Sequence, residues 1–384
     1  MPVLLSLVLI TICCLIIWRA SDGFEAASEY LGRNLSEGVR GATINAIGSS
    51  MPELFTTLFF LFILQDKDGF AGGIGTTAGS AIFNGMIIPA VVILIVVLKQ
   101  INSSVQVSRK VLFRDGLALL LCELVLIFLL GGDTLDWTHG MVLMLLYLVY
   151  MFYMLSSMRK AQRAAGTEEG EDDDEAESKG FFLDTITLNL EPLFIKGEMR
   201  SGNAWSLLIA SMIIIGAACM LLVKSCEWMG DAMGVPIYFI AVVLASAATS
   251  VPDTILSMKD AQKGNYDDAV SNALGSNIFD VCFALGFPLF LFTIFYGPIT
   301  MSPETVQNVS ELRILLFILT FLAFIIYIAR TKMGGMSAFL LLLIYVAFTL
   351  FILGRSVDAE FSGEISNGLH SINEFLDTLR FWNH

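Results

Sequence analysis

Long apolar runs, separated by short polar loops, recur along almost the entire chain. A helix needs about 20 predominantly apolar residues to cross the hydrocarbon core of a bilayer. The pattern therefore predicts ten membrane-spanning segments, at residues 2–18, 41–64, 70–98, 112–131, 138–157, 203–223, 235–258, 268–297, 311–329 and 335–353. We expect an all-α membrane protein, integral and multi-pass, that contacts the lipid bilayer along most of its length.

An acidic stretch, TEEGEDDDEAE at residues 167–177, separates five predicted segments from the next five. We predict a first five-helix half at 1–160, an acidic cytoplasmic loop at 161–202, a second five-helix half at 203–353 and a tail at 354–384. The acidic stretch is typical of a solvated linker. A calcium-collecting or regulatory role for 167–178 is the alternative, although the EF-hand spacing is absent. Apolar residues recur at helical spacing in the tail, which predicts an interfacial helix.

Composition and charge agree with this organisation. The chain is 56% hydrophobic and 15% charged, whereas soluble domains average roughly 45–50% and about 25%. Of the 22 Lys and Arg residues, 17 lie in or beside the loops that follow the odd-numbered segments. This bias predicts that those loops are cytoplasmic and that both termini are outside. We expect the protein to lie in the cell (plasma) membrane. The net charge of −14 gives no reason to expect a nucleic-acid partner, and no pattern in the chain fixes an oligomeric state.

Two pairs of short motifs occur in the same order in both halves. The first half carries GSSMPE at 48–53 and GSAIFN at 79–84, and the second carries ATSVPD at 248–253 and GSNIFD at 275–280. Because each half has five segments, the second copy enters the membrane from the opposite side. The pattern thus predicts two inverted-topology five-helix repeats, which in transporters place a site near the midplane.

The residue types in these motifs predict a cation site. Pro52 and Pro252 lack an N–H, so each frees backbone oxygen in the preceding turn, and such oxygen needs a partner at membrane depth. A carboxylate at that depth is costly and is a functional-site hypothesis by default. The neighbouring hydroxyl and amide side chains are spaced by three or four residues, which places them on one helix face. The predicted ligands are Glu53, Asp253, Asp280, Asn84, Ser49, Ser50, Ser80, Thr249, Ser250 and Ser276.

This ligand set consists only of oxygen atoms, which favours hard cations such as Ca²⁺ or Na⁺ over zinc or copper. Six cysteines lie mostly in apolar segments and form no CxxC pair, so we interpret them as buried thiols. No group in the motifs indicates covalent chemistry, so we expect no enzyme activity and no cofactor. Glu123 also falls inside a predicted span, but it has no counterpart in the other half and stays unassigned.

At these motifs the chain resembles the cation/calcium exchanger superfamily, and most closely the potassium-dependent sodium/calcium exchangers. The similarity covers residues 41–89 and 240–288, with GATINAIGSSMPELFTTL and GIGTTAGSAIFN in the first and SVPD and GSNIFD in the second. The resemblance implies a fold of two inverted five-helix halves. It also implies that Glu53 and Asp253 are carboxylates shared by Na⁺ and Ca²⁺, and that Asp280 is linked to K⁺. Ser49 and Ala248 depart from the family's usual Thr and Gly, which bears on ion preference.

The resemblance implies a sodium/calcium antiporter that works by alternating access. Three ionised carboxylates carry a charge that Ca²⁺ plus K⁺, or three Na⁺, would balance, and a low-dielectric site favours such neutral loading. The alternative within transport is a cation/proton exchanger for Ca²⁺ or another divalent ion, although GSSMPE lacks the Gly-Asn typical of that branch. More distant alternatives are a cation channel and a sensor that uses the acidic loop.

Overall fold

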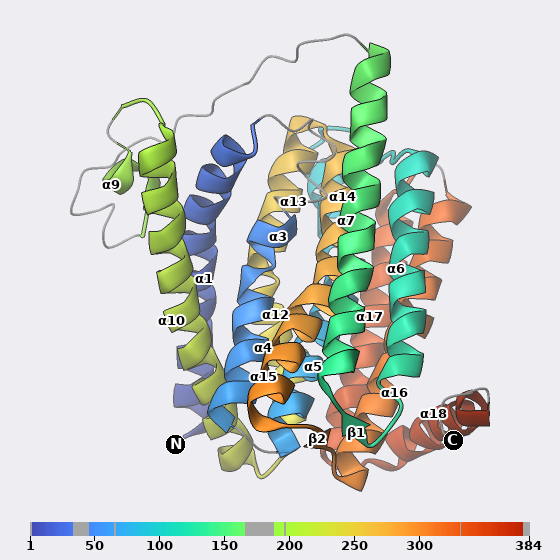
Figure 1. Ribbon diagram of the computed structural model, residues 1–384. Helices are drawn as coiled ribbons and strands as arrows, with labels where there is room; N and C mark the ends of the chain where they lie inside the picture. The colour runs from blue at the N-terminus through green and yellow to red at the C-terminus, as the bar shows by residue number, and fades with distance from the viewer. Residues whose placement is uncertain are drawn as a thin grey trace.

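The computed structural model is a bundle of long helices that run between two polar ends (Figure 1). It describes residues 2–33, 46–64, 67–165, 188–195, 197–330 and 332–378. The first half contains α1 (Val3–Leu31), α3 (Ala46–Ser49), α4 (Met51–Leu64), α5 (Lys67–Leu98), α6 (Arg109–Leu129) and α7 (Trp137–Ala165). The acidic stretch at 167–177 lies outside the described residues.

After the first half, the chain continues with the short α9 (Glu191–Phe194), in the predicted loop, and ends with α18 (Glu360–Thr378), in the predicted tail. Between them lie α10 (Ser201–Met233), α11 (Ile237–Ile240), α12 (Ser246–Thr249), α13 (Val251–Lys263), α14 (Tyr266–Phe279), α15 (Leu285–Tyr296), α16 (Pro303–Ala329) and α17 (Gly335–Ser356). Two π-helical turns, η2 (Ala241–Ala245) and η3 (Asp280–Ala284), interrupt this series. Strand β1 (Thr134–Leu135) pairs antiparallel with β2 (Ile299–Thr300), with Thr134 opposite Thr300.

Within the described residues, each of the ten predicted segments coincides with a helix or with a row of consecutive helices, but several bounds were wrong. Helix α1 continues to Leu31, far beyond the predicted end at Trp18. Helix α10 likewise continues to Met233, and α16 begins at Pro303 instead of residue 311. The additional turns carry charged or polar side chains, so the apolar run is shorter than the helix that contains it.

Eight helical segments in the described part of the chain are long and apolar enough to cross a membrane. Two other segments that were predicted to span do not meet this measure. Helix α4 has only 14 residues, and the start of its predicted segment, residues 41–45, lies outside the described ranges. Helix α6 has 21 residues but carries Arg114, Asp115 and Glu123 near or within its apolar stretch.

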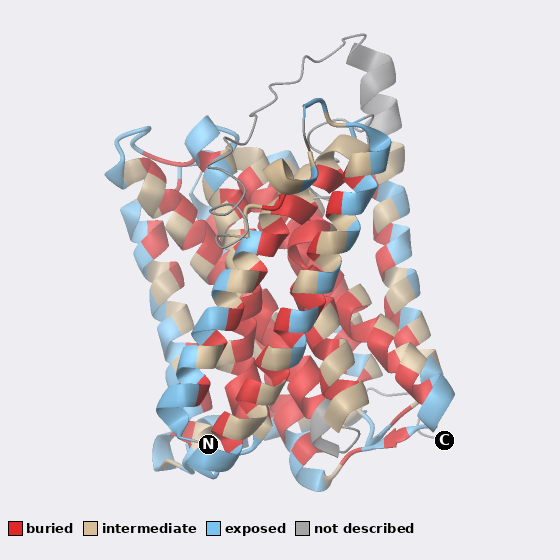
Figure 2. Ribbon diagram, turned by 90° about the vertical axis from the view of Figure 1, so that its left-hand side faces the viewer, coloured by how far each residue is buried: buried red, intermediate tan, exposed pale blue. Residues whose placement is uncertain are grey.

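Helix α5 occupies the centre of the bundle, where it contacts α4, α13, α14, α16 and α17. Helices α1 and α10 pack along each other at one edge, on the left in Figure 1. Buried residues fill the interior while the outer faces are exposed (Figure 2). Many exposed side chains on the outer helices are large and apolar, including Leu148 and Phe152, as a lipid-facing surface requires.

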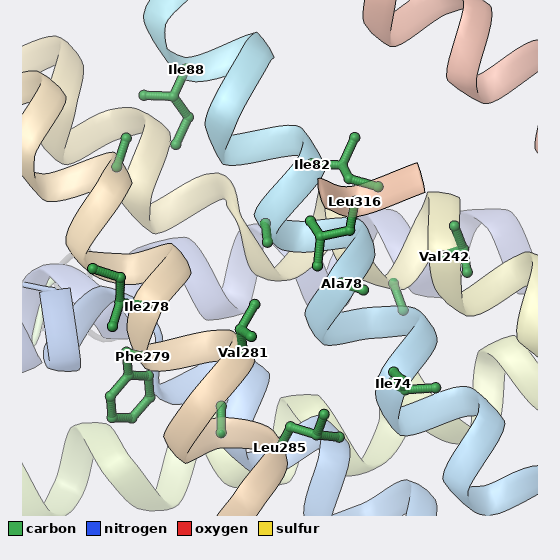
Figure 3. Packing of buried hydrophobic residues seen from close by; sticks show 14 of the residues in the cluster. Ile74, Ala78, Ile82, Ile88, Val242, Ile278, Phe279, Val281, Leu285 and Leu316 are labelled. Atoms are coloured by element: carbon green, nitrogen blue, oxygen red, sulfur yellow. The ribbon is translucent and has the colours of Figure 1, made fainter. Parts of the chain in front are cut away.

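One face of α5 packs in an apolar layer and the other carries polar residues. Ile74, Ala78 and Ile82 are buried, and Figure 3 shows them in a row along this helix. Because residues two apart on a helix point in different directions, Ser80 faces away from this layer. The apolar packing therefore fixes the rotation of α5 and directs its polar face to the opposite side.

A close helix crossing holds α5 against η2. A Cβ atom added at Gly79 would lie 2.3 Å from the carbonyl oxygen of Val242 and 2.9 Å from the Cβ of Ser246. No side chain fits in that space, so glycine is required for the two backbones to touch. The crossing lies one residue before Ser80 and fixes the position of that hydroxyl.

Candidate cation-binding site

The two motifs that contain proline fall at breaks in their helices. Ser50 separates α3 from α4, and Ser250 separates α12 from α13. Ser250 has φ −80° and ψ 0°, outside the regular helical region. Because Pro52 and Pro252 have no N–H to donate, the carbonyl oxygens one turn earlier lose their helical donors. The breaks therefore occur where the sequence predicted them.

The Gly-Ser motif of each half contacts the carboxylate of the same half. Ser80 Oγ donates a hydrogen bond of 3.0 Å to Glu53 Oε1, and Ser276 Oγ donates one of 2.7 Å to Asp253 Oδ1. All four residues are fully buried. The same arrangement thus occurs twice, once between α4 and α5 and once between α13 and α14.

Other contacts cross between the halves. Asn84 Nδ2 donates to Asp253 Oδ2 at 3.0 Å. Ser80 Oγ lies 3.1 Å from Asp280 Oδ2 as well, so its single O–H is shared between Asp280 and Glu53. The hydroxyl oxygens of Ser80 and Ser250 lie 2.8 Å apart. The three carboxylates and their neighbours consequently form one connected cluster at the centre of the bundle.

The remaining predicted ligands also lie at this cluster. Ser49 interacts with Asp253, and Thr249 interacts with Glu53. Each hydroxyl thus reaches the carboxylate of the opposite half, which is a second reciprocal relation between the repeats. Ser50 lies near Asp280, although its buried hydroxyl has no hydrogen-bond partner among the described residues. The structure therefore brings together all ten residues that the sequence singled out.

Several oxygen atoms of the cluster accept no hydrogen bond within the described residues. Glu53 Oε2, Asn84 Oδ1 and Asp280 Oδ1 are buried and have no hydrogen-bond partner among the described residues. None of the ion pairs in the described ranges joins a Lys or Arg to Glu53, Asp253 or Asp280. Burying unpaired acceptors and charges costs several kcal/mol. A hard cation held by these oxygens would supply the missing positive charge.

The two halves differ in one feature that the sequence did not predict. Asp280 opens the π-helical turn η3, whereas its counterpart Asn84 lies within the regular helix α5. A π-helical turn contains an additional residue per turn and often occurs at functional sites. The turn sets the direction in which the Asp280 side chain leaves its helix, and no periodic signal in an apolar segment marks it.

Two further buried carboxylates lie on α6, away from these contacts. Glu123 accepts a 2.7 Å hydrogen bond from Thr320 of α16, while its other oxygen has no partner in the described part of the chain. Asp115 forms a paired contact with the adjacent Arg114, at 2.6 and 2.8 Å, and accepts from Ser271 at 2.7 Å. The adjacent Arg and Asp inside a predicted span were the available signal for this second group.

Comparison with known proteins places this chain in a family. A family model described as sodium/calcium exchanger protein matches residues 5–156 and 203–354. The chain is 36% identical over 140 residues to the sodium/potassium/calcium exchanger Nckx30C of Drosophila melanogaster. That alignment covers 36% of this chain and 16% of the relative, so the chain spans well under two thirds of that protein.

Solved structures share the fold along most of the chain. A structure of the H⁺/Ca²⁺ exchanger CAX is similar with a TM-score of 0.62 and 14% identity, covering 97% of this chain and 93% of that one. A structure of the sodium-calcium exchanger NCX_Mj is similar with a TM-score of 0.56 and 22% identity, covering 90% of this chain and 97% of that one. At these identities the likeness establishes the fold of an integral, multi-pass membrane protein. Because the family model matches most of the sequence in both halves, the chain belongs to the sodium/calcium exchanger protein family.

Proposed function

We propose that this protein exchanges Na⁺ for Ca²⁺ across a membrane, with the ten-residue cluster as the shared cation site. The observation that carries the proposal is the buried hydrogen-bond network, through Ser80 and Asn84, that links the carboxylates Glu53, Asp253 and Asp280. None of the ion pairs in the described ranges gives these carboxylates a basic partner. The names of the relatives and the family match agree with it. By family the chain is an ion exchanger and not an enzyme, and the transported ions are its ligands.

The mechanism that fits this geometry is alternating access. Na⁺ and Ca²⁺ compete for the same carboxylate oxygens, so loading with one ion expels the other. An empty site that carries three negative charges is costly to move through a low-dielectric interior, which couples the two fluxes. The reciprocal contacts, with Ser49 on Asp253 and Thr249 on Glu53, support two inverted five-helix halves that close around the site.

The proposal extends to K⁺ through Asp280. Its Oδ1 atom is buried and has no partner among the described residues, while Oδ2 accepts from Ser80. A third carboxylate allows Ca²⁺ and K⁺ to be held together with their charges balanced. The relative from Drosophila melanogaster is named for sodium, potassium and calcium together, in agreement with this assignment.

The placement in the membrane follows from the same proposal. We infer ten spans, with the Lys- and Arg-rich loops after the odd-numbered segments in the cytoplasm and both termini outside, in the plasma membrane. The tail helix α18 fits an interfacial position. Ser366 on its inner face donates to Glu311 of α16, whereas Phe361 and Phe375 are exposed. An exposed apolar face at the end of a membrane bundle suits the boundary between lipid and water.

A cation/proton exchanger is the second candidate, because the fold is also similar to that of the H⁺/Ca²⁺ exchanger CAX. Reconstituted vesicles distinguish the two. An outward Na⁺ gradient should drive Ca²⁺ uptake, and a pH gradient without Na⁺ should not. Uptake driven by the pH gradient alone would support the proton exchanger. Deletion of 167–178 should leave uptake intact, whereas loss of all activity would favour a sensor built on the acidic loop.

A further inference from the structure

A small cavity lies between α1 and the broken helices that carry Ser49 and Pro252. Its walls include Ser21, Asp22 and Glu25 of α1, together with Ser49 and Pro252 from the two broken helices. The cavity volume is about 10 Å³, close to the smallest space that holds one water molecule. Because Ser49 and Pro252 belong to the cluster motifs, the cavity directly adjoins the proposed site.

The α1 wall of this cavity offers oxygen atoms to a cation. Ser21 is 6% exposed, and its buried Oγ atom has no hydrogen-bond partner within the described ranges. Glu25 lies three residues after Asp22 and four after Ser21, spacings that bring side chains together on a helix, and all three residues line the cavity. A hydroxyl and two carboxylates are ligands of the type that Ca²⁺ and Na⁺ prefer.

A lysine of α13 occupies the outer end of this array. Lys259 Nζ lies 3.1 Å from Asp22 Oδ1 and 3.8 Å from Glu25 Oε2. Its ammonium group therefore stands where a cation bound to the two carboxylates would stand. The Lys259 side chain is 48% exposed. An exposed ion pair of this kind is worth little net energy, so the lysine can be displaced at low cost.

We propose that this cavity is a transit site, in which a cation pauses between Ser21, Asp22 and Glu25 before it reaches Ser49, and that Lys259 closes it. The inference rests on the proposed exchange function and assigns the access route on one face of the membrane. When Lys259 swings away, the two carboxylates attract a cation from the water. The Ser21 hydroxyl then supplies the next ligand, within the cavity that Ser49 also lines.

This role accounts for features that an ion pair between two helices leaves unexplained. A purely structural ion pair needs neither the cavity beside it nor an unpaired Ser21 hydroxyl in the cavity wall. Negative charge around a narrow opening also raises the local cation concentration and the association rate. At the α1–α13 contact, Asp22 and Glu25 thus attract a cation to the cavity, and Ser21 offers it a ligand inside.

The first test measures access and needs no transport. The S21C thiol is labelled with a membrane-impermeant thiol reagent in proteoliposomes, with the wild-type protein labelled in parallel to subtract the six native cysteines. We expect labelling only from the membrane face that carries the carboxyl-terminal end of α1, at Leu31. Ca²⁺ should slow labelling at least threefold, and K259Q should accelerate it, whereas K263Q, which removes the same charge one turn along α13, should not. Labelling that neither Ca²⁺ nor K259Q changes would overturn the proposal.

The second test measures the Ca²⁺ dependence of sodium-driven uptake from that face. D22N and E25Q should each raise KM for Ca²⁺ roughly threefold or more, because they remove attractive charge at the opening, with kcat unchanged. E29Q, a matched change one turn beyond on α1, should leave KM near wild type. If uptake is intact and KM is unchanged in D22N and E25Q, the transit site is wrong and the exchange function stands. If the wild-type protein shows no sodium-driven uptake, the exchange function itself fails.

Discussion

Asp280→Asn removes one of three negative charges from the cation cluster while it keeps the shape of the side chain. In the structure Asp280 Oδ2 accepts from Ser80 at 3.1 Å, and Oδ1 is buried without a partner in the described part of the chain. An asparagine can retain an oxygen toward either position. The substitution therefore tests the charge of Asp280 and not its volume.

The expected size of the effect follows from the burial of the site. A monovalent ion in contact with the carboxylate, roughly 3 Å away, gains about 5 kcal/mol at an effective dielectric constant near 20. The cost of dehydrating the ion offsets part of this gain. If a net gain in K⁺ binding free energy of only about 1.4 kcal/mol remains, removal of the charge weakens K⁺ binding tenfold. We therefore expect the apparent K⁺ affinity of D280N to fall at least tenfold.

The assay is Na⁺-driven Ca²⁺ uptake into proteoliposomes over a range of K⁺ concentrations. Wild-type uptake should rise with K⁺ and saturate. D280N should retain measurable Ca²⁺ uptake that no longer responds to K⁺ over that range. Glu123→Gln is the matched control, because it neutralises a buried carboxylate outside the cluster and should keep the wild-type K⁺ response. A K⁺ dependence in D280N equal to that of the wild type would refute the assignment of Asp280.

Three other predictions follow from individual contacts. Gly79→Ala should cost about 1–3 kcal/mol of stability because its Cβ would meet a carbonyl oxygen at 2.3 Å. Thermal unfolding should therefore show a lower Tm. Gly85→Ala should match the wild type, because its Cβ would lie 3.6 Å from the nearest atom, Nδ2 of Asn277. Glu123→Gln should keep Ca²⁺ uptake within about twofold of wild type, since a glutamine oxygen can still accept from Thr320. A complete loss of uptake in a folded variant would instead make Glu123 part of the transport site. A hydrogen bond from the Thr138 hydroxyl lowers the pKa of Asp136 at the start of α7, so its contribution to stability is present at neutral pH and is lost as the pH falls through that lowered pKa. The Tm difference between wild type and D136N should accordingly shrink in acid, and a difference that is constant with pH would contradict this origin.

The sequence predicted the ten helical segments and the composition of the cluster for identifiable reasons. Apolar runs of spanning length reveal helices directly, and a proline beside a carboxylate marks a break at Ser50 and again at Ser250. The repeat then links positions that lie far apart in the chain. Contacts such as Ser80 with Asp280 follow once two copies of one motif are assumed to face each other.

Other features leave no mark in the pattern of apolar residues and could not be predicted from it. The turns of α1 beyond Trp18 are polar, so hydropathy placed its end too early. The π-helical turn at Asp280 leaves no mark in the spacing of apolar residues. Lys259 and Asp22 lie on helices from different halves, and only the packing of α1 on α13 brings them together.

The central claim is that Na⁺ and Ca²⁺ compete for one site that requires Glu53. Equilibrium binding of radioactive Ca²⁺ to the purified protein, measured as Na⁺ is increased, tests it most directly. We expect Na⁺ to displace Ca²⁺ completely from the wild type, and a folded Glu53→Gln variant to lose Ca²⁺ binding, while Glu123→Gln binds normally. Ca²⁺ that stays bound at saturating Na⁺, or wild-type binding by the Glu53→Gln variant, would contradict the account.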